Sequence, residues 1–266
     1  AGIRAITLTN GLALSVGETQ GGMNDEVMKF MLRRTVEEHF KKEKFYKGKG
    51  IKVLSLFFID KVKNYREYDT NGNPAKGKFA GWFEEIYRQE IAKPAYGGLL
   101  PYDVHDVHNG YFSQDSKGKV KDTEGESQAD YDTYKLIMQD KEKLFDPDTP
   151  LRYINSHSAL REGWDSPNVF QICTLNETRS EIKKRQEIGR GLRLSVNHNG
   201  DRIFVRNINK LTVVANERYE DFAKALQNEI QEDCGVDFTG RVKNRGDRQK
   251  VGLRKGFEAD PKFLQI

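Results

Sequence analysis

Two arginines in the last third of the sequence have the spacing of groups that contact one phosphate chain. The run reads Gln186-x-x-Gly189-Arg190-x-x-Arg193, and a helix would place both guanidinium groups on one face. Phosphoryl transfer is accelerated by fixed positive charge near the transferred group, and guanidinium groups supply such charge. Two arginines taken alone more often form surface salt bridges, so the run needs support from its surroundings.

A second polar segment lies upstream of the arginines. It reads Ser158-Ala-Leu-Arg-Glu-Gly163-Trp-Asp165-Ser-Pro167-Asn-Val169, a glycine turn followed by an aspartate and a proline that lead directly into an apolar strand. Gln186 comes seventeen residues after Val169. The order and spacing of the two segments favour a shared catalytic role over surface salt bridges.

Three other patterns suggest chemistry but lack the required context. The run Gly72–Lys78 has the spacing of a phosphate-binding loop, but Phe79 stands where a magnesium-binding Ser or Thr is required. Pro147-Asp148 with Glu181-Ile-Lys183 matches a weak nuclease pattern, in a stretch that looks helical rather than extended. Four potential metal ligands lie in a polar loop, and we predict no metal site from them: Asp103, His105, Asp106 and His108.

The elements that would position these residues alternate between helical and strand patterns. We predict a hairpin around Asn10-Gly11 and a helix that is capped by Asn24. The buried stripe of that helix is predicted to be Met28, Leu32, Val36 and Phe40. Further strands are predicted at 51–60, 151–154, 169–175, 202–206 and 211–215, and helices at 79–91, 130–145, 179–189 and 217–232. This alternation predicts an α/β fold with a mostly parallel central sheet flanked by helices, and residues 93–128 read as a polar surface insertion.

Composition excludes some functional classes. The 266 residues carry a net charge of +4, which is too small to predict nucleic-acid binding by itself. Cys173 and Cys234 lie far apart and form no metal-binding or redox pair. No apolar stretch approaches the roughly 18 residues that span a bilayer, so we expect a cytoplasmic protein.

The two polar segments carry a family resemblance. Ser156–Leu175 and Arg179–Arg193 resemble motifs V and VI of superfamily-2 helicases, and they are most similar to the Res (restriction and motor) subunit of type III restriction enzymes. Further similarity covers Gly22–Asp25, Phe57–Val62, Ala215–Glu217 and Tyr219–Phe222. The resemblance implies the second RecA-like domain of a helicase-type motor, in which strand 51–60 is the motif IV strand and faces nucleic acid.

The resemblance also implies a role for each matched residue. Arg190 and Arg193 would be arginine fingers in ATP hydrolysis, with Gln186 beside them. Residues expected to line the ATP site are Gly163, Asp165 and Gly189. Residues expected to contact the DNA backbone are Ser158, Ser156, Arg161 and Lys61. Either serine could present the phosphate-contacting hydroxyl, and we prefer Ser158 because it lies nearer the turn.

A complete Res subunit also carries a Walker A loop, a Walker B acidic pair and a nuclease domain, none of which is found in this sequence. We therefore expect residues 1–22 to connect from a first motor domain, 23–235 to form the second RecA-like domain, and 236–266 to be a basic linker toward a nuclease domain. ATP and Mg²⁺ would be bound mainly by the first domain. Expected partners are double-stranded DNA and a modification methyltransferase subunit. By itself this piece should not hydrolyse ATP.

Two other functions remain open from the sequence. The chain could be a RecA-like module that binds DNA or a protein without catalysis. It could also be the motor domain of another superfamily-2 helicase. Mutation of Arg190 in the full-length protein would separate the first alternative from the catalytic prediction.

Overall fold

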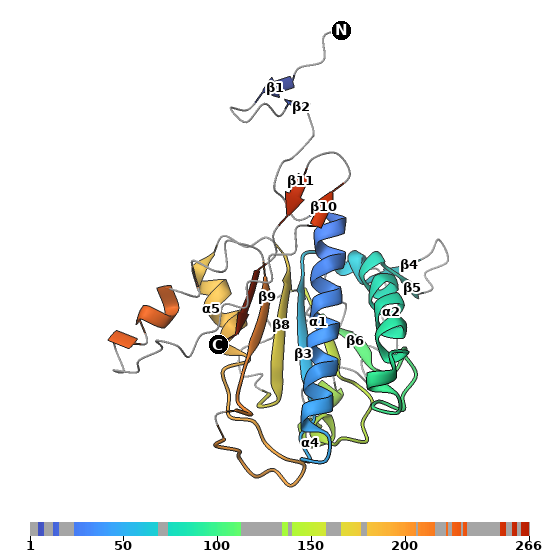
Figure 1. Ribbon diagram of the computed structural model, residues 1–266, viewed down its shortest axis with the longest axis vertical. Helices are drawn as coiled ribbons and strands as arrows, with labels where there is room; N and C mark the ends of the chain where they lie inside the picture. Colours follow the sequence, from blue (N-terminus) through green and yellow to red (C-terminus); the bar gives the residue numbers. More distant parts are fainter. Residues whose placement is uncertain are drawn as a thin grey trace.

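The computed structural model arranges the chain as drawn in Figure 1. The residues that it describes are 5–7, 13–15, 24–68, 74–112, 135–137, 140–157, 166–176, 180–205, 207–215, 222, 225–229, 231–232, 251–253, 257–259 and 262–265. No helix within these residues combines the length and the apolar composition that a bilayer crossing requires.

The centre of the fold is a six-stranded sheet in the order β12-β9-β8-β3-β7-β6. Its strands are β3 (Leu54–Ile59), β6 (His108–Tyr111), β7 (Tyr153–Ser156), β8 (Val169–Leu175), β9 (Thr212–Ala215) and β12 (Lys262–Gln265). β12 pairs antiparallel with β9, and the other five strands are parallel. Every residue of β3 is buried, as expected for a central parallel strand that is covered on both faces. The predicted α/β, RecA-like architecture is confirmed.

Two long helices cover one face of the sheet. α1 (Asp25–Tyr46) is capped by Asn24, whose side chain accepts a hydrogen bond from the backbone N–H of Val27 at 2.9 Å, as predicted. The predicted apolar stripe of α1 is buried. It packs in one core with α2 (Lys78–Ile91) and with residues of the sheet that include Phe57, Cys173 and Val214. Figure 1 shows α1 lying along the sheet with α2 beside it.

Shorter helices cover the opposite face. α4 (Lys141–Phe145) and α5 (Glu181–Gly189) contribute Leu144 and Ile188 to a second core. That core also holds residues from the neighbouring strands β3, β8 and β9, among them Leu56, Ile172 and Val213. Successive strand residues point to opposite faces, so the sheet divides the interior into two layers with helices on either side.

Small hairpins and single turns make up the other described elements. β1 (Ala5–Thr7) pairs antiparallel with β2 (Ala13–Ser15), which confirms the hairpin predicted around Asn10-Gly11. β4 (Arg66–Tyr68) pairs with β5 (Pro74–Lys76), and β10 (Val251–Leu253) pairs with β11 (Phe257–Ala259). Two 3₁₀ turns are η1 (Val62–Asn64) and η2 (Pro94–Tyr96). β12 lies within the range predicted to be a basic linker.

Part of the predicted surface insertion belongs to the sheet instead. β6 lies inside the range 93–128 and pairs in parallel with β7, with His108 opposite Tyr153. Its sequence, His-Asn-Gly-Tyr, lacks the β-branched and apolar residues that identify a strand. An edge position tolerates such a sequence because only one side is paired. Residues 113–128 lie outside the described residues.

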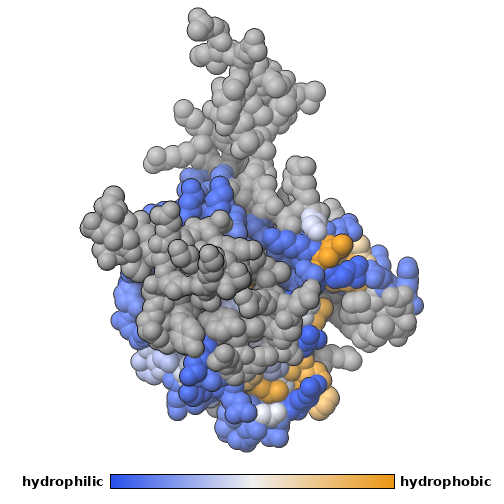
Figure 2. All heavy atoms as spheres, turned by 180° about the vertical axis from the view of Figure 1, so that it is seen from behind, coloured by the Kyte–Doolittle hydropathy of each residue, from blue (hydrophilic) through white to orange (hydrophobic). Residues whose placement is uncertain are grey.

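The strand predicted at 202–206 is wrong for the part that the structure describes. Residues 202–205 form only an isolated bridge between Arg202 and Val196. Phe204 and Val205 are 77% and 54% exposed. β9, the strand that follows this run in the chain, is paired on both sides, with β8 and with β12, so it leaves no free side for the run. Figure 2 shows that the described surface seen from behind is mostly hydrophilic, with small hydrophobic areas.

Candidate functional site

α5 carries the predicted arginine run toward the edge of the sheet at which β8 and β9 begin. The helix starts after Ser180, whose hydroxyl accepts a hydrogen bond from the backbone N–H of Lys183 at 3.3 Å. Its last turn is anchored by the buried side chains of Glu187 and Ile188. The amide of Asn176, just after β8, donates to the carboxylate of Glu187 at 3.3 Å. The helix therefore starts near the carboxyl end of β8 and returns toward the amino-terminal edge.

The two arginines do not share a helical face, contrary to the prediction. α5 ends at Gly189, and the backbone N–H of Arg190 caps it by bonding to the carbonyls of the last turn. Arg193 lies beyond the helix in a segment without regular structure. Glycines at positions 189 and 191 disfavour a longer helix because glycine loses the most backbone entropy on ordering. Arg190 is half-buried, whereas Gln186 and Arg193 are exposed.

Gly191 fixes the path of the chain between the two arginines. A Cβ atom at this position would lie 2.4 Å from Cδ1 of Leu211 and 3.2 Å from Cδ1 of Ile172. A Cβ atom at Gly189 would meet nothing within 4 Å. The sequence alone does not indicate Gly191, because its need to be small comes from β8 and β9, which are distant in the chain.

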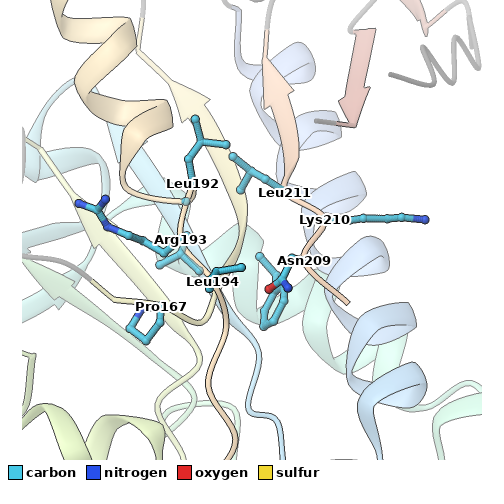
Figure 3. Close-up of a pocket in the computed structure, with 10 residues that line it drawn as sticks. Pro167, Leu192, Arg193, Leu194, Asn209, Lys210 and Leu211 are labelled. Carbon is cyan, nitrogen blue, oxygen red and sulfur yellow. The ribbon is translucent and has the colours of Figure 1, made fainter. Parts of the chain in front are cut away.

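A groove of about 290 Å³ lies beside Arg193 (Figure 3). Its apolar walls come from the starts of β8 and β9 and from the segment after α5, and they include Pro167, Val169, Leu192, Leu194 and Leu211. Arg193 and Lys210 also line it, and Figure 3 shows their side chains pointing away from each other. The amino-terminal edge of the sheet thus presents an apolar groove bordered by two cations.

Side chains from the last turns of α1 form hydrogen bonds to backbone carbonyls at this edge of the sheet. The ammonium of Lys42 donates to the carbonyls of Phe170 at 2.6 Å and Lys210 at 2.9 Å. The hydroxyl of Tyr46 donates to the carbonyl of Ile208 at 2.6 Å. Burial lowers the pKa of Lys42 to about 7, because a charged amine is poorly solvated in the interior. Lys42 and Tyr46 therefore cross-link α1 to the segments that line the groove.

Lys61 and Ser156 lie at the opposite, carboxyl-terminal edge of the sheet. Ser156 is the last residue of β7 and is aligned with Phe58 of β3. Lys61 follows the end of β3 by two residues and is exposed. Ser156 is only 1% exposed, which removes its hydroxyl from the surface that a DNA backbone would contact. Among the residues that the structure describes, Lys61 and Ser156 thus lie at one edge and Arg190 and Arg193 at the other.

The remaining predicted site residues lie outside the described residues, namely Ser158, Arg161, Gly163 and Asp165. The connection that contains them joins the end of β7 to the start of β8. Both strands run parallel to β3, which lies between them in the sheet. The connection therefore returns from the carboxyl-terminal edge to the amino-terminal edge and links the two predicted sites along the chain.

The phosphate-loop-like run and the nuclease-like pattern both lack the required structural context. β5 belongs to a two-stranded hairpin outside the central sheet, and Lys78 is ion-paired with Asp25 at 2.5 Å. A phosphate-binding loop instead follows a buried parallel strand. The residues Glu181–Lys183 form the first turn of α5 rather than a strand.

Two of the four residues considered as metal ligands meet a third residue that the sequence did not indicate. His105 Nδ1 and His108 Nε2 lie 3.0 Å and 3.6 Å from Oε1 of Glu84 on α2. The ammonium of Lys76 lies 2.7 Å from the same oxygen, and Arg88 lies 3.2 Å from Oε2. Two permanent cations thus already neutralise the carboxylate, and a divalent cation placed there would be repelled by both.

The same cluster has a clear structural role. Burial lowers the pKa of His108 to about 4, so its imidazole is neutral at physiological pH. The hydroxyl of Tyr65 is hydrogen-bonded to Nδ1 of His108 at 2.9 Å. We assign these contacts to anchoring β6 and the β4–β5 hairpin against α2.

The known proteins that are similar to this chain are described as Res subunits of type III restriction-modification enzymes. The chain is 39% identical over 220 residues to the Type III restriction-modification enzyme EcoPI Res subunit of Escherichia phage P1, covering 77% of this chain and 22% of that protein. It is 38% identical over 214 residues to the EcoP15I Res subunit of Escherichia coli, covering 75% and 21%. It is 30% identical over 297 residues to the StyLTI Res subunit of Salmonella typhimurium, covering 97% and 28%. No family model matches the chain. The chain thus spans between about a fifth and three tenths of the length of these relatives.

Proposed function

Because this chain is a homologue of the Res subunits of type III restriction-modification enzymes, we propose that it is the second RecA-like motor domain of an ATP-dependent restriction endonuclease. In this role it supplies Arg190 and Arg193 to an ATP molecule, with Mg²⁺, that is held mainly by a first RecA-like domain. It also supplies contacts to the backbone of double-stranded DNA. Closure of the two domains on ATP would then change the grip on DNA.

The observation that carries the proposal is the placement of the arginine segment. α5 and Gly191 direct the segment to one edge of the sheet, where Arg193 is exposed beside the groove. Negative charge spreads over the transferred phosphoryl group in the transition state, and guanidinium groups held in position stabilise it there. Gln186 is exposed on the same helix. Gly163, Asp165 and Gly189 would complete the chain's side of the ATP site.

The DNA-binding half of the proposal uses the other edge. Lys61 is exposed at the end of the β3 strand, and Arg161 and Ser158 belong to the connection that follows β7. The burial of Ser156 supports Ser158 as the serine that donates a hydroxyl to the DNA backbone. Phosphate contacts of this kind fix position but carry no sequence information. Choice of the target sequence would therefore belong to a modification methyltransferase subunit.

Two substitutions in the intact protein test the two halves together. Arg193→Ala should lower the kcat of DNA-stimulated ATP hydrolysis by roughly 10³- to 10⁵-fold while DNA affinity stays near that of the wild type. Lys61→Ala should weaken DNA binding and reduce the slope of log affinity against log salt by about one. Arg185→Ala is the matched control, because Arg185 lies on α5 but is ion-paired with Glu229 at 2.6 Å.

Hydrolysis at the wild-type rate by Arg193→Ala would remove the finger assignment and favour a non-catalytic DNA- or protein-binding module. Salt dependence unchanged in Lys61→Ala would remove Lys61 from the DNA contacts. Equal losses in Arg185→Ala and Arg193→Ala would show a general effect of removing positive charge from this region rather than the loss of a finger.

A further inference from the structure

A buried asparagine ties the segment after Arg193 to the central sheet. Asn168 is 1% exposed, and its Oδ1 accepts a hydrogen bond from the backbone N–H of Val196 at 2.8 Å. Its Nδ2 donates to the carbonyl of Val196 at 3.0 Å. The carbonyl of Asn168 itself accepts from the backbone N–H of Leu54 at 2.9 Å. One residue thereby joins β3 to a point three residues beyond Arg193.

A second asparagine closes the loop that follows. Oδ1 of Asn209 accepts from the backbone N–H of Ser195 at 2.9 Å and from its hydroxyl at 2.8 Å. Nδ2 of Asn209 donates to the carbonyl of Ile203 at 2.6 Å. These bonds hold the loop in shape, but they lie within residues 195–209. Ile203 and Ile208 of this loop pack in one apolar cluster with Phe170 of β8, and Asn168 adds the two side-chain hydrogen bonds that fix the loop against the start of β8.

Asn168 also lies close to the predicted site residues in the chain. It follows Asp165 by three residues, directly between the connection from β7 and the start of β8. Its amide therefore lies where the connection predicted to contact DNA ends and where the arginine segment is held. The two hydrogen bonds from Asn168 hold Val196, three residues beyond Arg193, against the start of β8.

We propose that Asn168 is a positioning residue for Arg193, because its two hydrogen bonds to Val196 hold the backbone three residues beyond the arginine in place. This inference rests on the proposed function. Asn168 does not reach the nucleotide and acts only through the segment that it holds. A displacement of about 1 Å of a positioned group can cost roughly 100-fold in rate, so loss of the two hydrogen bonds should be measurable.

The first test compares two asparagines of the intact protein. Asn168→Ala should lower the kcat of DNA-stimulated ATP hydrolysis by roughly 10- to 100-fold with little change in the KM for ATP, because the arginine acts mainly on the transition state. Asn197→Ala should stay near the wild type, because Asn197 bonds only within its own turn, to the backbone of Asn199 and Asp201 and to the side chain of Asp201. A wild-type kcat in Asn168→Ala would overturn the inference.

The second test combines the substitution with Arg193→Ala. If Asn168 acts through Arg193, adding Asn168→Ala to Arg193→Ala should cause no further loss, whereas a general structural defect would lower both backgrounds equally. Equal losses in both backgrounds therefore overturn the inference. Wild-type activity of Arg193→Ala alone would instead contradict the proposed function. If Asn168→Ala does not fold, Asn168→Asp serves in the same cycle, since it keeps an acceptor for Val196 but loses the donor.

Discussion

Arg190 and Arg193 differ in local structure and in exposure. Arg190 sits at the carboxyl terminus of α5, where the helix dipole favours a cation, and it is half-buried. Arg193 is exposed and lies beyond the helix, so its placement depends on the path of the chain at Gly191. The close approach of Gly191 to Leu211 therefore helps to set where Arg193 lies.

A methyl group at Gly191 tests this dependence. Gly191→Ala would place its Cβ 2.4 Å from Leu211, and relief of such a clash typically costs roughly 1–3 kcal/mol. We expect a lower midpoint of thermal unfolding and a lower kcat for ATP hydrolysis. Gly189→Ala is the matched control for stability, since its Cβ enters open space. Equal unfolding midpoints for the two variants would contradict the assigned role of Gly191.

Local sequence indicates the chemistry of these side chains better than their geometry. The spacing of Arg190 and Arg193 and the resemblance around them are enough to predict an ATP-related role. The shared helical face was wrong because Gly189 and Gly191 disfavour a helix that reaches Arg193, and the path beyond the helix depends on how Gly191 packs against β8 and β9. Asn168 and Lys42 were missed for the same reason, since their partners Val196, Phe170 and Lys210 are distant in the sequence.

The elements around the site are cross-linked by buried polar groups as well as by apolar packing. α1 packs its apolar stripe against the sheet, but its last turns contact the site through Lys42 and Tyr46. Even a neutral amine has two N–H bonds, one for each of the two carbonyls that Lys42 contacts. This cross-link joins the starts of β8 and β9 to one helix.

The lowered pKa of Lys42 predicts a dependence of stability on pH. Its pKa is about 7 in the folded chain and returns to the ordinary lysine value of 10.5 on unfolding. Between these values the unfolded chain binds more protons, so the free energy of unfolding rises with pH. We expect the unfolding midpoint of Lys42→Met to rise less than that of the wild type between about pH 7 and about pH 10.

Two other lysines make this comparison specific to Lys42. The pKa of Lys52 is lowered to about 6, mainly by burial. Lys52 is present in both proteins, so its contribution to the pH dependence cancels in the comparison. Lys41→Met is the control, because Lys41 is exposed and ion-paired with Glu38 at 2.6 Å. Parallel curves for Lys42→Met and the wild type would contradict the lowered pKa of Lys42.

Elements with strong apolar patterns were predicted well. β3 and β8 were found from apolar runs, and α1 from its stripe and its Asn24 cap. β6 was missed because an edge strand needs little apolar sequence, and a strand was wrongly predicted at 202–206 because pairing depends on which edges are free. Both errors concern strand partners, which local sequence does not specify.

The whole molecule separates its predicted tasks between the two edges of one sheet. The arginine segment and its groove lie at the amino-terminal edge, and Lys61 lies at the carboxyl-terminal edge. The connection from β7 to β8 joins these edges, with Asn168 at its end. A domain built in this way could close on ATP with one edge while it holds DNA with the other.

The most direct measurement is a structure of the intact protein with DNA, ADP and aluminium fluoride, which mimics the transferred phosphoryl group. We predict that the guanidinium groups of Arg190 and Arg193 lie within hydrogen-bonding distance, about 3 Å, of the fluoride ligands. Lys61 should lie beside a DNA phosphate at the other edge. A bound analogue with both arginines directed to solvent or to other protein groups would contradict the central claim that this chain completes the ATP site.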